Sequence, residues 1–214
     1  MNFPKKMMLG SVLLLGASSV FANTADLRVI GSIAPSACTP VFAGGAVVDY
    51  GVIPNTSLNP TASTTLAPRT INYSITCNGP LPISTSWSDT RSGTAIPGAL
   101  AAINYFGLGT HSGDNIGNYM IENIVAGTTA DGNPVTVVQR NSNTETWFLA
   151  TTATVANNGI RQYSYAPVGT LVPGAFSTYA GALRVTATIA PTQSLDMSTE
   201  VTLDGLSTMT VHYL

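Results

Sequence analysis

The residues most able to do chemistry stand together in FGLGTHSGDNIG, residues 106–117, where His111, Ser112 and Asp114 lie within four positions. Hydrolysis by a serine nucleophile needs a histidine base within hydrogen-bond reach and a carboxylate that orients this base. Three neighbours in one loop seldom align in that way, and the sequence has no Gly-x-Ser-x-Gly elbow. We interpret the segment as a glycine-rich turn between two strands, and we expect no enzyme activity.

The same segment offers no phosphate or metal site by pattern. Gly107, Gly109 and Gly113 lack the lysine and the following helix of a phosphate-binding loop. Asp204-Gly205 is interpreted as a tight turn or bulge, because a lone carboxylate cannot fill the six to eight oxygen positions around calcium. Ten scattered acidic residues show no carboxylate pair of the kind that glycoside hydrolysis uses. We therefore expect no cofactor and no metal.

The two tryptophans are the candidates for ligand contact. Trp87 stands in the alternating run 83–89, which predicts a strand with this side chain in the core. Trp147, in TETWFLA, is the better candidate for an exposed contact, for example with a carbohydrate ring. A binding module is therefore one alternative function.

The N-terminus has the features of a secretory signal. Lys5 and Lys6 precede the short apolar run MLGSVLLLGASSVF, which is shorter than the roughly 20 residues that span a bilayer. We assign residues 1–22 to a signal peptide and expect no membrane-spanning segment after its removal. The remaining 192 of 214 residues carry six arginines, no lysine and ten acidic residues, a formal charge of −4. Such a surface argues against nucleic-acid binding.

Short alternating runs separated by Gly, Pro and Asn predict an all-β sandwich of one domain. Residues 71–77 form one such strand, ending at Cys77. In an oxidising compartment the two cysteines, Cys38 and Cys77, favour one disulfide, and two free thiols are the alternative. In the chain-entropy model its loop of about 40 residues is worth about 4 kcal/mol.

The chain stops at LSTMTVHYL, residues 206–214, which alternates as a half-buried strand does. Met209, Val211 and Tyr213 share one face, and His212 lies on the other, solvated face. Nothing follows this strand in the sequence, so its second edge must be completed by something else.

Taken together, these features resemble the subunits of chaperone–usher fimbriae. The likeness covers residues 23–214 and is closest to enterobacterial fimbrial-like periplasmic proteins of the GltF and YhcF type. It rests on the order and spacing of four segments, which are ACTPVFAGGAVVDYG, ITCNGP, FGLGTHSGDNIG and LDGLSTMTVHYL.

This resemblance implies an immunoglobulin-like (pilin-type) sandwich, residues 31–214, that lacks its final strand. It implies export to the periplasm and then to a surface fimbrium that serves adhesion. The partners would be a periplasmic chaperone, an outer-membrane usher and neighbouring subunits, each exchanging a strand at the open edge. Because the chain is longer than a typical major subunit, added loops are expected within 124–173.

The resemblance also assigns roles to residues. The donor strand would be the extension 23–30, with Leu27 and Val29 as its plugs. Met209, Val211 and Tyr213 would line the acceptor groove or its rim, and the Leu214 carboxylate would be held by basic residues of the chaperone. The alternative is a binding module on the same fold that does not polymerise.

Overall fold

The structure, a computed structural model, describes residues 28–30, 37–150 and 154–214. The chain divides into two compact units, Met1–Ala34 and Pro35–Leu214, and the following account concerns the second. The signal peptide and most of the extension, including Leu27, lie outside the described residues. Within the described part of the chain, no helical segment has the length and hydropathy needed to span a bilayer.

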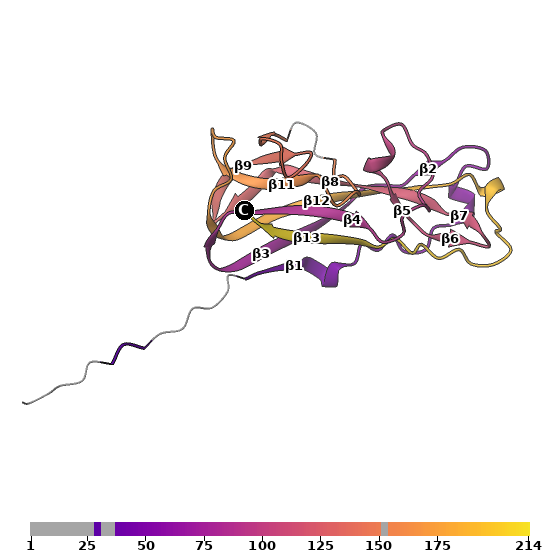
Figure 1. Ribbon diagram of the computed structural model, residues 1–214. Coiled ribbons are helices and arrows are strands. Elements are labelled where there is room, and N and C mark those ends of the chain that lie inside the picture. The colour runs from indigo at the N-terminus through magenta and orange to yellow at the C-terminus, as the bar shows by residue number, and fades with distance from the viewer. Residues whose placement is uncertain (1–27, 31–36, 151–153) are drawn as a thin grey trace, which may run out of the picture. The chain divides into compact units, whose positions relative to one another are not determined.

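The second unit is built of strands (Figure 1). The long strands are β1 (Cys38–Phe42), β3 (Arg69–Leu81), β4 (Ile83–Asp89), β8 (Gly117–Ala130), β9 (Asn133–Arg140), β11 (Gln162–Pro167), β12 (Phe176–Ile189) and β13 (Ser207–Tyr213). Two-residue strands are β2 (Thr64–Thr65), β5 (Phe106–Gly107), β6 (Thr110–His111), β7 (Asp114–Asn115) and β10 (Phe148–Leu149). The described helical turns are the short 3₁₀ segments Ala43–Ala46, Asn55–Ser57, Ala102–Asn104 and Thr192–Ser194.

The long strands form one antiparallel ladder in the order β1-β3-β12-β8-β9-β11-β4-β13. β8 and β9 pair at only two positions, Thr129 with Pro134 and Ala130 with Asn133. The ladder folds over at this short junction, so β1, β3, β12 and β8 make one layer and β9, β11, β4 and β13 make the other. The predicted all-β sandwich is confirmed.

Aromatic side chains join the two layers through the core. The Tyr73 hydroxyl on β3 lies 2.9 Å from the Tyr165 hydroxyl on β11. The Tyr165 ring also packs against Tyr179 of β12, with ring centroids 4.8 Å apart. Burial raises the pKa of both Tyr73 and Tyr165, so both hydroxyls stay protonated and can share this buried hydrogen bond.

The strand order corresponds to an immunoglobulin-like domain with one place vacant. Constant-type domains have sheets A-B-E-D and C-F-G. In their order across the sheet, β1, β3, β12 and β8 take the places of A, B, E and D, while β4 and β13 take those of C and F. Among the described residues no strand takes the place of G beside β13.

The strand predictions are confirmed with two corrections. The runs at 83–89 and 206–214 form β4 and β13, and Trp87 is buried. The strand predicted to end at Cys77 continues to Leu81, which pairs with Phe176 of β12 beyond a register shift. The extra length within 124–173 was predicted to be loops, but it supplies β9 and β11, which widen the second layer.

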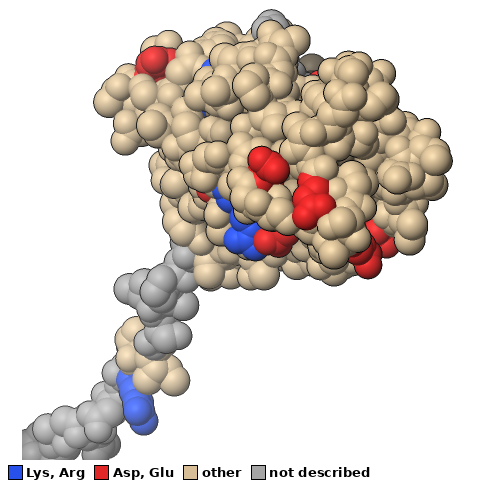
Figure 2. Space-filling view, turned by 90° about the vertical axis from the view of Figure 1, so that its right-hand side faces the viewer, with Lys and Arg blue, Asp and Glu red and all other residues tan. Residues whose placement is uncertain are grey.

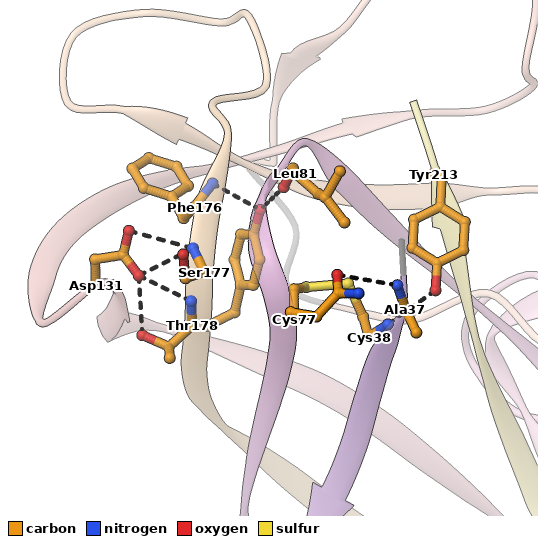
Figure 3. Close-up of a disulfide and its surroundings, with 11 residues drawn as sticks. Ala37, Cys38, Cys77, Leu81, Asp131, Phe176, Ser177, Thr178 and Tyr213 are labelled. Carbon is orange, nitrogen blue, oxygen red and sulfur yellow. Dashed lines mark hydrogen bonds between the residues drawn. A yellow bond between two sulfur atoms is a disulfide. The ribbon is translucent and has the colours of Figure 1, made fainter. Parts of the chain in front are cut away.

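The disulfide between Cys38 and Cys77 is present and confirms the predicted pairing. The two residues face each other in the β1–β3 register, with Cα atoms 4.0 Å apart (Figure 3). Cys77 is buried in the core. The bridge therefore fixes the edge strand β1 to the domain, and it fits an oxidising compartment such as the periplasm.

On the end of the domain that Figure 2 displays, charged side chains are few, and Asp and Glu are more numerous than Lys and Arg. This view agrees with the low charge content of the sequence.

We predict that replacing both cysteines, Cys38→Ala with Cys77→Ala, lowers the free energy of unfolding by about 2–4 kcal/mol, because β1 loses its covalent link to β3. Urea denaturation of the oxidised wild type and the double variant measures this difference. The control is Val41→Ala, an exposed residue of the same strand, which should change stability by less than about 0.5 kcal/mol. A double variant as stable as the wild type would contradict the assigned role.

Candidate functional site: an open groove beside the last strand

The last strand has a hydrogen-bonding partner on one side only. β13 pairs with β4 along its whole length, from Ser207 opposite Asp89 to Tyr213 opposite Ile83. Within residues 28–30, 37–150 and 154–214 no second strand pairs with it. Alternate N–H and C=O groups of β13 therefore face an open edge that a further strand can use.

A cavity of about 740 Å³ opens beside the start of this strand. Residues 46–53 form one wall and residues 199–207 form the opposite wall. Core side chains from both layers form its floor, among them Ile71, Trp87, Tyr119, Ile121, Leu183 and Val185. The groove is thus a part of the sandwich interior that the described residues leave uncovered.

The first wall is anchored by Tyr50. Its hydroxyl donates to the carbonyl of Val185 at 2.9 Å and accepts from the N–H of Ala187 at 3.1 Å. Both groups belong to β12. Partial burial raises the pKa of Tyr50, which keeps the phenol protonated as a donor. These two hydrogen bonds hold the segment 46–53 to β12.

The second wall is held by an ion pair. The Arg91 guanidinium donates to both carboxylate oxygens of Asp204, at 2.9 and 2.8 Å. This contact raises the pKa of Arg91 and lowers that of Asp204. The Asp204 N–H also donates to the carbonyl of Leu108 at 3.0 Å. The wall is therefore fixed just before β13 begins.

Asp204-Gly205 was predicted to be a tight turn or bulge, but no turn is found at these two residues. The glycine serves close packing instead. A Cβ added to Gly205 would stand 2.8 Å from Cε1 of Tyr119. Tyr119 is itself buried, and burial raises its pKa to about 12.

The predicted groove residues lie at different places along β13. Met209 and Val211 pack against the core, but Ser207 is the one β13 residue among those that line the cavity. The exposed Tyr213 accepts the N–H of Cys38 through its hydroxyl at 2.9 Å (Figure 3). Leu214, also exposed, donates its N–H to the carbonyl of Pro82 at 3.1 Å.

Of the predicted donor plugs, Val29 is described and is exposed, whereas Leu27 lies outside the described residues. The role of the extension as a donor strand remains a prediction from the sequence.

Trp147 is partly buried and lies away from the residues that line the groove. The guanidinium of Arg140 stacks over its ring, 4.5 Å from the centroid. Arg140 also donates to the side-chain oxygen of Gln162 at 2.7 Å and to the carbonyl of Asn143 at 3.1 Å. Since Arg140 covers one face of the indole, less of the ring is free to stack on a sugar.

The segment with His111, Ser112 and Asp114 is a hairpin, as predicted. β6 and β7 pair through His111 and Asp114, and Ser112 takes a left-handed φ of 51° at the turn. Nε2 of His111 lies 3.3 Å from the hydroxyl of Thr199. The described residues include no group of three or more His, Cys, Asp or Glu side chains arranged to hold a metal ion.

His212 lies on the face of β13 opposite Tyr213, and its Nε2 is 2.8 Å from the hydroxyl of Ser86 on β4. Desolvation lowers its pKa, and the positive charge of Arg140 adds to this effect. The prediction was a solvated or edge position, and His212 is half-buried on the strand at the end of the described ladder.

Comparison with known proteins gives the family. Residues 27–136 match the family described as "Protein of unknown function (DUF1120)". The chain is also 30% identical over 244 aligned positions to the protein GltF of Escherichia coli (strain K12), covering 95% of this chain and 94% of that protein. This chain belongs to the DUF1120 family. A second relative, the uncharacterized protein YhcF of the same strain, is 26% identical and covers 100% of both chains.

The DUF1120 match begins within the extension and ends in β9, so it includes the first wall and much of the floor of the groove. Neither wall was predicted from the sequence. The apolar run VVDYGVI, residues 47–53, is a signal that could have revealed the first wall. The part of the second wall that precedes the predicted strand, residues 199–205, has no such apolar run and is defined only by where the chain lies in space.

We predict that Gly205→Ala lowers the free energy of unfolding by about 1–3 kcal/mol, because the new methyl group overlaps the Tyr119 ring. Thermal or urea unfolding measures the change. The matched control is Gly79→Ala, where nothing lies within 4 Å of the added Cβ. Equal effects of the two substitutions would show that the Tyr119 contact is not the cause.

We predict that stability falls as the pH drops from about 6.5, because the lowered pKa of His212 means that the unfolded chain takes up this proton first. Urea unfolding between pH 7.5 and 5 measures this, and His212→Gln should flatten the profile. The carboxylates with lowered pKa, Asp131, Asp196 and Asp204, contribute only at lower pH, near and below 3.8. His111→Gln is the control, and an unchanged slope in His212→Gln would contradict the assignment.

Proposed function

We propose that this DUF1120 protein is a fimbrial or fimbrial-like subunit whose groove accepts a β-strand from another chain. The observation that carries the proposal is the apolar cavity beside the unpaired edge of β13. A strand added at this edge would hydrogen-bond to β13 and place alternate side chains over the cavity. It would fill the place of strand G that the sandwich leaves vacant.

The chemistry of the groove favours a strand with apolar side chains on one face. The floor is made of aliphatic and aromatic side chains, and charged residues of the lining, Asp49 and Glu200, stand on its walls. The extension 23–30 fits this description, since Leu27 and Val29 alternate with Asp26 and Arg28. In a donor strand the charged pair would point away from the cavity toward water.

The resemblance to chaperone–usher subunits supplies the partners of this proposal. A periplasmic chaperone would cover the edge of β13 after export, and the extension of a neighbouring subunit would replace it at the outer-membrane usher. An unpaired edge invites uncontrolled pairing, so such a protein needs a companion until it assembles. Surface fibres and adhesion are the proposed outcome of this assembly.

The alternative, a non-polymerising binding module, would use the cavity for a small apolar ligand or Trp147 for a sugar. The stacking of Arg140 on Trp147 weakens the second form. The open edge beside the cavity weakens the first, because a small ligand would leave the hydrogen-bonding groups of β13 unused.

The test uses the chain from Asn23 to Leu214, oxidised, and a peptide with the sequence of residues 23–33. We predict that the peptide stabilises the folded protein, by about 2.7 kcal/mol at a free concentration 100 times its Kd. Urea unfolding with and without peptide measures the gain. The extension of the protein itself could compete, so the peptide is also tested on a chain that starts at Pro35.

The matched control is the same peptide with Leu27→Asp and Val29→Asp, which should give no gain because charged side chains would enter an apolar cavity. A peptide with Asp26→Ala and Arg28→Ala should stabilise as the parent does. No gain with the parent peptide, or the same gain with the charged one, would overturn the proposal.

A further inference from the structure

We propose that the apolar turn 167–173, between β11 and β12, is a contact surface for the next copy of this chain in an assembled fibre. This inference rests on the proposed function. It adds a specific interface between the bodies of two subunits to the exchange of a strand.

The turn presents apolar side chains to solvent. Val168 is 68% exposed, Leu171 46% and Val172 73%. No charged residue stands between Pro167 and Pro173. Three neighbouring exposed aliphatic side chains in one turn are an unusual feature of a surface that water alone covers, and they are typical of an interaction site.

Hydrogen bonds hold the turn in this form. The N–H and the hydroxyl of Thr170 both bond to the carbonyl of Pro167, at 3.0 and 2.9 Å. Gly169 takes a φ of 82°, and the N–H of Gly174 bonds to the carbonyl of Tyr165 at 2.9 Å. These hydrogen bonds hold the turn in the conformation in which the three side chains are exposed.

The turn lies at the end of the domain where the N-terminal extension is attached. Strand register places the end of β11, the Leu81–Ile83 connection and the end of β13 together, through Ser164–Ser84, Phe176–Leu81 and Tyr213–Ile83. The Cys38 N–H bonds to Tyr213 at this same end. Figure 3 shows Phe176, Leu81, Cys38 and Tyr213 in one field.

The length of the segment between Ile30 and Cys38 then determines which molecule lies against the turn. From Ile30 to Cys38 the chain makes eight steps, which span at most about 28 Å. A copy whose groove holds residues 23–30 must therefore lie close to Cys38, so its body meets the end that carries the turn. The occupant is the copy that accepts the donor strand.

The facing surface is also apolar. A donor that runs antiparallel to β13, as strand G runs beside F, leaves the groove near Ser207. Val47, Val52 and Leu206 are exposed and line the same cavity as Ser207, and Val52 is 95% exposed. The turn of one copy would meet this rim on the next, a head-to-tail contact that repeats along a fibre.

The first test is self-association of the chain 23–214, measured by sedimentation velocity. Leu171→Asp and Val172→Asp should each weaken association at least tenfold. Leu149→Asp is the matched control, because Leu149 is 48% exposed against 46% for Leu171 and lies on β10. Stabilisation of each variant by the 23–33 peptide is measured in parallel, which reports on the groove alone.

The second test needs no disruptive change. Val172→Cys provides a single free thiol, because the two cysteines of the sequence are bonded to each other. We expect its reaction with a maleimide to slow at least tenfold in assembled protein compared with monomer saturated with the 23–33 peptide. An Asp variant that unfolds would not affect this measurement.

The outcomes separate the two proposals. Peptide stabilisation together with unchanged association in both Asp variants, or an equally reactive thiol in the assembly, overturns the contact and leaves the strand exchange intact. No stabilisation and no association of the wild type overturns both. Weakened association with normal peptide stabilisation supports both.

Discussion

β13 is the strand on which the rest of this domain depends, because among the described residues it pairs with one strand alone, β4. Its pairing with β4 completes the second layer, and its outer edge marks where the sandwich stops. Each layer has four long strands, with β1 and β13 at the outer edges, and the cavity lies beside the start of β13, where a further strand could cover the exposed part of the core.

Three interactions hold the segments around the groove in place. Tyr50 ties one wall to β12, and the Arg91–Asp204 pair ties the other wall to the end of β4. The disulfide fixes β1 to β3, so the edge strand cannot move across to cover β13. Each of these three interactions fixes a segment that could otherwise move over the groove.

The sequence predicted the strands in which apolar and polar residues alternate, and it missed the irregular segments. Alternation located β4 and β13 and the buried face of β3, since a period of two is a property of neighbouring residues. The disulfide was predicted from the presence of two cysteines in a chain expected in an oxidising compartment. The walls at 46–53 and 199–207 could not be found in this way, because they are irregular segments whose position depends on Tyr50 and Asp204 bonding to distant strands. Gly205 was interpreted as a turn for the same reason: its neighbour in space, Tyr119, is remote in sequence.

The strands that this chain adds to the immunoglobulin-like pattern affect where the protein can make contacts. β9 and β11 extend the layer that contains β13, but on the side away from the open edge. They therefore leave the groove untouched and place new connections at the ends of the sandwich, including the turn 167–173. An insertion beside β13 would have filled the vacancy, whereas an insertion between β8 and β12 enlarges the domain without closing it. The two features of this surface, an open edge and a rigid apolar turn, are thus independent in the chain, so substitutions in one can be made without altering the other.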